Sequence, residues 1–254
     1  MNARYDAVGD AYRQFKTTAA IPVPERRLFH DLLGDVSGLR VLDLATGYGL
    51  YARLALAQGA AEVVGVDISA EMVRGARRAT AGDEIAFHTA DARDLPELRD
   101  FDVVTAVWLF NYAQSPDDLA DMAAGAAGAL RPGGRLVAIT VHPAYDAAGP
   151  DWIRYGLVVH DVAPVPRGQR LDVSLSTPTQ DIPLTVFRWD ADVYAEAMTR
   201  NGLDAPTWRV PHIPAEEAAR WEPNYWDAAV ANPLIAGFSC VRGAADPGGA
   251  KARS

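Results

Sequence analysis

The chain has 254 residues, of which 49% are hydrophobic and 22% are charged, so we expect one compact domain with a sizeable core. The net charge of −9 argues against nucleic acid as a partner, because binding to phosphates requires a positive surface. The one cysteine, Cys240, excludes an intramolecular disulfide and favours the cytoplasm. The first residues do not have the order of a signal peptide, and no apolar run approaches the roughly 20 residues of a membrane helix. We therefore expect no membrane partner.

From residue 39 onward, short apolar runs alternate with helical patterns. The runs are rich in β-branched residues and apolar on both sides, as strands buried in a parallel sheet are. A series of strands and crossover helices predicts an α/β fold with a doubly wound, Rossmann-like and mostly parallel sheet. The expected strands are 41–45, 62–67, 85–89, 101–107 and 135–141.

Helix ends are marked by capping residues. A helix over 50–58 is expected to end at Gly59, which suits the left-handed position after a helix. Ser69 and Ser115 are expected to cap two later helices, the second with Pro116 at its first position.

The pattern changes at 143–189, where prolines are frequent and a hairpin of 171–176 and 184–188 is expected. We interpret this stretch as a small cap inserted over the carboxyl edge of the sheet. A helix over 191–200 and strands near 206–210 and 235–242 should complete a single domain of residues 1–242, and 243–254 should be a disordered tail. The aromatic residues Trp221, Tyr225 and Trp226 between the last two strands would either line a pocket or pack the edge strand.

The first strand leads into a glycine-containing loop, Asp43-Leu-Ala-Thr-Gly47-Tyr-Gly49. The two glycines allow a sharp turn and leave the backbone bare, so a ligand can approach it closely. Asp43 could accept a hydrogen bond from an ammonium group or hold the loop. The loop alone also fits a dinucleotide site.

Acidic residues recur where three successive strands end. Asp67 ends the second strand, where a carboxylate can accept from both hydroxyls of a ribose, and Asp91-Ala92 follow the third, where they could meet an adenine edge. Each aspartate alone could be a solvated loop residue or a helix cap. Together with Asp43 they line one crevice, and they fit an adenosine that carries an amino acid.

These motifs resemble those of the class I S-adenosylmethionine-dependent methyltransferases over about residues 39–142. DLATGYG resembles the glycine-rich first motif, with Ala45 in place of the more usual glycine, and VVGVDIS resembles the acidic second motif. TADARDLP, FDVVTAVWLFNYAQS and LRPGGRLV resemble the three that follow. More broadly, the chain is similar to bacterial N-methyltransferases of secondary metabolism, such as the toxoflavin-biosynthesis group.

The resemblance implies S-adenosylmethionine as the cofactor and a reversed hairpin formed by the last two strands. It also implies that residues 1–38 form a helical cover over the cofactor, with Tyr12 near the cofactor's carboxylate. Ile68 and Met72 should enclose the adenine, and the backbone near Trp108 should meet the methionyl group. The expected cofactor-binding residues are Tyr12, Asp43, Ala45, Thr46, Gly47, Gly49, Asp67, Ile68, Met72, Asp91, Ala92 and Trp108.

The chain lacks the Asn/Asp-Pro-Pro-aromatic run of enzymes that methylate amino groups of nucleic acids and proteins. We therefore expect a small acceptor, aromatic or heterocyclic. No cluster has metal-ligand spacing, so no metal is expected. His142, at the end of the fifth strand, and His160, in the cap, are candidates for a catalytic base, although either could be structural. The expected substrate contacts are Tyr112, His142, Tyr145 and His160.

Two other functions stay open at this point. The glycine pattern would also fit a nicotinamide-dependent oxidoreductase. The chain could also be a non-catalytic partner subunit that binds S-adenosylmethionine. A homo-oligomer is possible.

Overall fold

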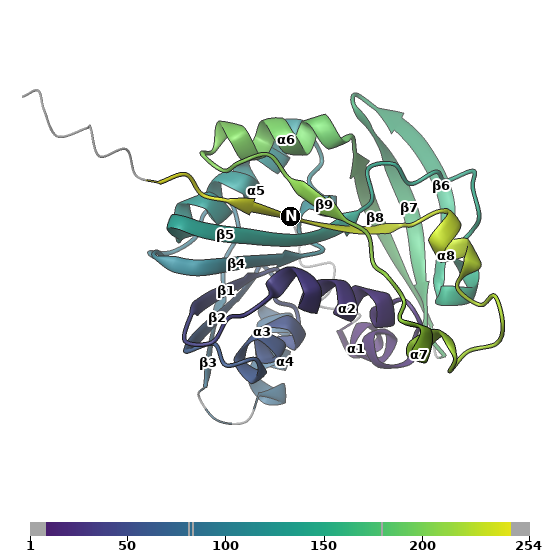
Figure 1. Cartoon of the computed structure of the whole chain (residues 1–254), viewed down its shortest axis with the longest axis horizontal. Helices are drawn as coiled ribbons and strands as arrows, with labels where there is room; N and C mark the ends of the chain where they lie inside the picture. Colours follow the sequence, from purple (N-terminus) through teal and green to yellow (C-terminus); the bar gives the residue numbers. More distant parts are fainter. Residues whose placement is uncertain (1–8, 81, 83, 179, 245–254) are drawn as a thin grey trace, which may run out of the picture.

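The computed structural model describes residues 9–80, 82, 84–178 and 180–244, and its centre is a seven-stranded sheet (Figure 1). The strand order is β3-β2-β1-β4-β5-β10-β9. The first five strands run parallel, and β10 is antiparallel to both β5 and β9. This confirms the expected doubly wound sheet with a reversed end. The strands are β1 (Arg40–Leu44), β2 (Glu62–Asp67), β3 (Ile85–Thr89), β4 (Phe101–Val107), β5 (Leu130–Val141), β9 (Thr207–Arg209) and β10 (Ile235–Val241).

Helices cover both faces of this sheet, as Figure 1 shows. Along β4, Val103 and Val107 face the core shared with α2, α3 and α4, whereas Val104 and Ala106 face the core shared with α5 and α6. Both faces are therefore buried, which explains why the strands are continuously apolar. These helices are α2 (Pro22–Leu33), α3 (Leu50–Ala57), α4 (Ala70–Ala79), α5 (Pro116–Ala129) and α6 (Ala191–Arg200).

The capping residues act as expected. The Oγ of Ser69 accepts a hydrogen bond from the Met72 amide at 3.2 Å. The Oγ of Ser115 accepts one from the Asp118 amide at 3.1 Å. Gly59 follows α3 with φ of 93°, a conformation that a residue with a Cβ rarely adopts. Local sequence thus sets where these helices begin and end.

The cap is a separate antiparallel sheet of three strands, in the order β6-β7-β8. It comprises β6 (Leu157–Val165), β7 (Gly168–Ser176) and β8 (Asp181–Trp189), and the expected hairpin corresponds to β7 and β8. The sequence did not predict β6, which contains Pro164. β6 lies at an edge of the sheet, and an edge strand can accommodate proline because its outer side forms no ladder.

Short segments connect the cap to the rest of the molecule. Phe15 of α1 (Gly9–Thr18) and the adjacent Ala19 lie within 3.4 Å of where a Cβ on Gly156 would stand, so the N-terminal segment packs against the start of the cap. The remaining segments are η1 (Phe110–Tyr112), η2 (Ile153–Tyr155), α7 (Ala215–Ala218) and α8 (Asp227–Ala231).

Residues 1–8 of the expected cover and 245–254 of the expected tail lie outside the described residues. Within the described part of the chain, no helix is long and apolar enough to cross a bilayer.

The aromatic residues between the last two strands pack against one another. Trp221 stacks on Tyr225 with ring centroids 4.4 Å apart, and Trp226 stacks on Tyr155 at 5.2 Å. None of them lines either of the two pockets described below. These residues therefore pack as a cluster with Tyr155 of the η2 segment, and the edge-strand residue Trp208 instead packs against Tyr194 and Phe238.

Candidate active site

A wide pocket lies beside the carboxyl ends of β2 and β4, between the main sheet and the cap. Its volume of about 540 Å³ lies within the range of small-molecule sites. Ten of the residues expected to bind cofactor or substrate line it. These are Tyr12, Ala45, Gly47, Asp67, Ile68, Met72, Asp91, Ala92, Trp108 and Tyr112.

The loop after β1 turns sharply beside this pocket. Ala45 and Gly47 both have positive φ, 55° and 53° respectively. No atom lies within 4 Å of where a Cβ on Gly47 would stand, so its backbone forms a bare part of the wall. Gly49 has a different role, because a Cβ there would lie 2.9 Å from the Phe87 ring. It permits close packing of α3 against β3 and does not line the pocket.

Asp43 and Thr46 hold this loop in place through side-chain hydrogen bonds. The Asp43 carboxylate accepts hydrogen bonds from the hydroxyls of Thr46 at 2.7 Å and Thr105 at 2.6 Å. Burial raises the pKa of Asp43 from its ordinary 3.8 to about 6, although both hydroxyls act in the opposite direction. Neither Asp43 nor Thr46 lines the pocket. Of the two roles open for Asp43, the structure therefore favours holding the loop.

Asp67 lines the pocket at the end of β2. Its Oδ2 accepts from the Gly47 amide and its Oδ1 from the Ser69 amide, both at 2.8 Å. These bonds fix the carboxylate between the loop and the start of α4. Each carboxylate oxygen has a second lone pair, so the group can also accept from two hydroxyls of a ligand.

Apolar side chains form the adjacent wall. Ile68 is 37% exposed, whereas Met72 is buried with its side chain on the same pocket.

Asp91 and Ala92 follow β3 and also line the wide pocket. Asp91 forms an ion pair with Arg93, and the hydrogen bond from this guanidinium holds the pKa of Asp91 below its usual range. Ala92 is packed tightly under α5, since its carbonyl lies 1.8 Å from where a Cβ on Gly125 would stand.

This set of groups fits S-adenosylmethionine. Asp67 offers acceptors for ribose hydroxyls, Ile68 and Met72 offer apolar contact for an adenine, and Gly47 offers backbone that a ligand can approach. When bound, this cofactor supplies an electrophilic methyl group on a sulfonium.

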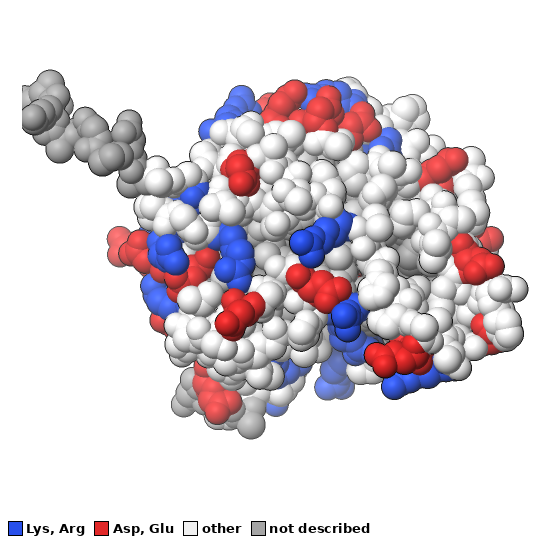
Figure 2. All heavy atoms as spheres, in the orientation of Figure 1, with Lys and Arg blue, Asp and Glu red and all other residues white. Residues whose placement is uncertain are grey.

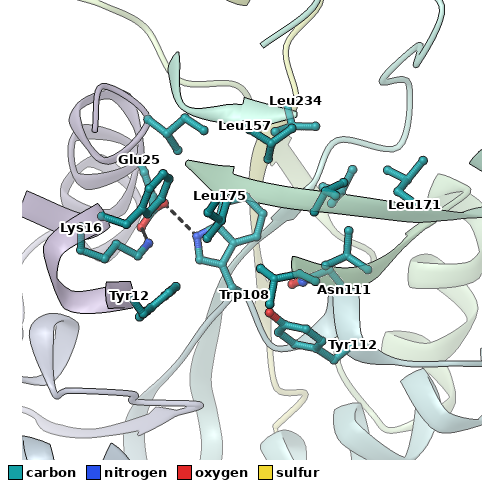
Figure 3. Close-up of a pocket in the computed structure, with 16 residues that line it drawn as sticks. Tyr12, Lys16, Glu25, Trp108, Asn111, Tyr112, Leu157, Leu171, Leu175 and Leu234 are labelled. Carbon is teal, nitrogen blue, oxygen red and sulfur yellow. Dashed lines mark hydrogen bonds and ion pairs between the residues drawn. The ribbon is translucent and has the colours of Figure 1, made fainter. Parts of the chain in front are cut away.

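A second, narrow pocket lies between α1, the end of β4 and the cap (Figure 3). Its volume is about 60 Å³. Tyr12, Trp108 and Tyr112 line both pockets and therefore stand where the two meet. The other walls are mostly apolar: Phe15, Ile21, Val141, Leu157, Leu171, Val173, Leu175, Leu184, Val186 and Leu234, with Lys16, Glu25 and Asn111 as the polar members.

Glu25 of α2 organises one end of the narrow pocket. Its carboxylate is fully buried and accepts from Lys16 Nζ at 2.5 Å, from Trp108 Nε1 at 2.8 Å and from the Tyr51 hydroxyl. Lys16 Nζ also lies 5.5 Å from the ring centroid of Tyr12 and 6.0 Å from that of Trp108, within cation–π range. Burial, with Glu25 as the next cause, raises the pKa of Tyr12 well above 10, so its phenol stays protonated.

The structure does not bring His142, Tyr145 or His160 to either pocket. The Nδ1 of His142 accepts from the Ala144 amide at 3.1 Å, and burial lowers the pKa of the imidazole. His160 lies on β6, with its Nε2 2.8 Å from the Ser174 hydroxyl. The role of a histidine as base stays a prediction, and the geometry favours structural roles for both.

Glu25, Lys16 and Asn111 are not among the site residues predicted from the sequence. A signal for Glu25 was present, because it lies one turn before Leu28 and Phe29 on the buried stripe of α2. An acid in such a stripe requires buried partners. Phe110, two residues after Trp108, does not line either pocket and packs against Tyr194 and Phe238 in the core.

Comparisons with known proteins identify a methyltransferase domain in the chain. Residues 41–134 match the methyltransferase domain family. A demethylmenaquinone methyltransferase from Clavibacter sepedonicus is 36% identical over 142 residues, which is 54% of this chain and 56% of that relative. The chain thus spans less than two thirds of the length of the curated relatives it matches.

Solved structures share the fold across most of the chain. A putative S-adenosylmethionine-dependent methyltransferase from Listeria monocytogenes has a TM-score of 0.65 at 20% identity, covering 88% of this chain and 98% of that one. The 1,6-didemethyltoxoflavin-N1-methyltransferase of Burkholderia thailandensis, solved with 1,6-didemethyltoxoflavin and S-adenosylhomocysteine, has a TM-score of 0.58 at 19% identity, covering 94% and 87%. The chain thus contains a match to the methyltransferase domain family over residues 41–134, and it shares the fold of solved structures described as S-adenosylmethionine-dependent methyltransferases.

Proposed function

We propose that this protein transfers the methyl group of S-adenosylmethionine to a small, largely apolar acceptor that enters the narrow pocket beside Trp108. One observation carries the proposal: Tyr12, Trp108 and Tyr112 line both the wide pocket and the narrow one. A cofactor on one side of these residues and an acceptor on the other would have their reacting atoms near the junction.

The wide pocket would hold the cofactor. Asp67 would accept from the ribose hydroxyls, Ile68 and Met72 would contact the adenine, and Asp91 and Ala92 would meet its edge. Tyr12, Gly47 and Trp108 would surround the methionyl part. These assignments are supported by the positions of the residues along one pocket wall.

The protein's main contribution to the reaction would be positioning. Methyl transfer from a sulfonium is a direct displacement, so rate depends on holding the acceptor atom in line with the methyl group and excluding water. The aliphatic side chains of the cap would exclude water. Glu25 would fix the Trp108 indole through their 2.8 Å hydrogen bond.

A small acceptor is also supported by surface charge and by the relatives. Figure 2 shows acidic and basic side chains interspersed on the face it presents, without a broad basic patch that would favour nucleic acid. The curated relative is named for demethylmenaquinone and the structural neighbour for 1,6-didemethyltoxoflavin, which are names of small organic molecules.

More specific features of the acceptor, the cellular role and the domain organisation belong to the same proposal. We propose an aromatic or heterocyclic acceptor, a role in bacterial secondary metabolism and a place in the cytoplasm. We also propose a single domain over 1–242, with a cover at 1–38 and a cap at 143–189.

Blocking the narrow pocket from the cap tests this function. Leu175 lines the narrow pocket but not the wide one, so Leu175→Trp should fill it while S-adenosylmethionine affinity stays within about twofold. Release of S-adenosylhomocysteine, measured with a panel of phenols, quinols and heteroaromatic amines, should fall at least about tenfold. The matched control is Val162→Trp on the exposed face of β6. Turnover that Leu175→Trp leaves unchanged, or that requires nucleic acid, would contradict the proposal.

A further inference from the structure

The narrow pocket contains one buried polar atom without a hydrogen-bond partner, the Oδ1 of Asn111. Asn111 lies in the η1 turn, three residues after Trp108, and is 2% exposed. Figure 3 shows its amide turned toward Trp108. The charged groups at the other end, Lys16 and Glu25, are paired with each other. The Oδ1 of Asn111 is therefore a buried oxygen on this pocket that the described residues leave without a hydrogen bond.

A buried carbonyl oxygen without a hydrogen-bond partner indicates which kind of group a ligand of this pocket would carry. Buried polar atoms are nearly always hydrogen-bonded, and each exception calls for an explanation. Two other buried atoms lack a partner among the described residues, Arg170 Nε and Trp226 Nε1. Neither residue lines the narrow pocket. The orphan oxygen of Asn111 instead lies among the aliphatic side chains of the proposed acceptor site.

We infer that Asn111 Oδ1 is the recognition point for an N–H or O–H group of the acceptor, which is therefore a narrow apolar molecule carrying a hydrogen-bond donor. This inference rests on the proposed function, because it takes the occupant of the pocket to be the methyl acceptor. The aliphatic walls would supply affinity, and the one polar contact would fix the orientation. An acceptor that lacks the donor would leave the oxygen unpaired and bind less well.

Two probes of nearly equal shape test the contact. Phenol carries an O–H where toluene carries a methyl group. Their dissociation constants are measured by NMR on the full chain with S-adenosylhomocysteine present, so that the wide pocket is filled. We expect the ratio of the toluene constant to the phenol constant to fall about fivefold in Asn111→Leu, which is the order expected for one hydrogen bond. An unchanged ratio overturns the inference.

A matched substitution separates ligand recognition from a structural role. Asn232 is also buried, but its amide forms three hydrogen bonds, with the Asp146 amide, the Asp146 carbonyl and the Pro150 carbonyl. Asn232→Leu should lower the unfolding temperature, whereas Asn111→Leu should leave it unchanged or raised, because Oδ1 has no partner to lose. Marked destabilisation by Asn111→Leu also overturns the inference. Failure of S-adenosylhomocysteine to bind the wild-type chain would instead contradict the proposed function.

Discussion

The indole of Trp108 donates a 2.8 Å hydrogen bond to the buried carboxylate of Glu25. The bond connects α2 of the N-terminal segment to a residue that lines both pockets. Trp108 also has a φ of 60°, which is unusual for a bulky residue and costs about 1–3 kcal/mol. Glu25 and the backbone bond from the Trp108 amide to the Ile139 carbonyl hold it in this conformation.

Removing Glu25 should therefore destabilise the protein. Glu25→Ala leaves the Lys16 ammonium, which is 9% exposed, without its partner, and breaking such a buried pair costs about 3–5 kcal/mol. Urea denaturation should show a loss of about this size in the free energy of unfolding. The exposed Glu216 offers the control, and Glu216→Ala should change stability by less than about 0.5 kcal/mol. Equal stability of the two variants would show that the Glu25 cluster is not structural.

The buried Asp43 should make stability depend on pH in a defined window. Its pKa is raised from 3.8 to about 6, so between these values the folded state holds a proton that the unfolded state has lost. The stabilising contribution of this group is thus present below pH 4 and is lost as pH rises through 6. This shift in pKa corresponds to a change of about 3 kcal/mol in the free energy of unfolding.

In the Asp43→Asn variant, position 43 no longer titrates. Comparison with the wild type therefore isolates the contribution of the Asp43 carboxyl group to the pH dependence of stability. We expect its stability relative to the wild type to rise by up to about 3 kcal/mol between pH 4 and pH 7. Urea denaturation at both pH values measures this difference, in which the other titrating groups cancel. A difference that stays constant over this range would mean that Asp43 is not perturbed.

The two candidate histidines can be tested separately. Removal of a catalytic base should lower turnover by about 10²–10⁴-fold. Because neither His142 nor His160 lines a pocket, we expect His142→Ala and His160→Ala to reduce turnover by less than about threefold. The measurement is S-adenosylhomocysteine release, with cofactor affinity determined in parallel. A loss of 10² or more at unchanged cofactor affinity would restore the assignment as base.

Features that depend on local chemistry could be predicted from the sequence. The strands of the sheet are apolar on both sides because both faces are buried, and this pattern is visible along the chain. Ser69 and Ser115 show where helices begin, because their side chains accept from nearby amides. The acid at the end of β2 lies on the wide pocket as strand order requires.

Features that depend on side-chain direction could not be predicted in the same way. His142 follows β5 as expected, but its amide donates to the Leu234 carbonyl and its ring turns to Ala144. The order of the strands predicts which backbone segments lie at the carboxyl edge of the sheet. It does not predict the direction of the side chain that follows a strand. The lack of a hydrogen-bond partner for Asn111 Oδ1 likewise depends on which side chains of α1 and the cap line the narrow pocket.

The most direct test of the central claim is calorimetric titration of S-adenosylmethionine into the wild-type chain and the Asp67→Ala variant. We expect S-adenosylmethionine to bind the wild-type chain and the substitution to weaken this binding at least about tenfold, because charge-assisted hydrogen bonds to the ribose are lost. The control Asp121→Ala, an exposed acid on α5, should bind as the wild type does. Tight binding of a nicotinamide cofactor with no binding of S-adenosylmethionine, or an Asp67→Ala variant with unchanged affinity, would contradict the central claim.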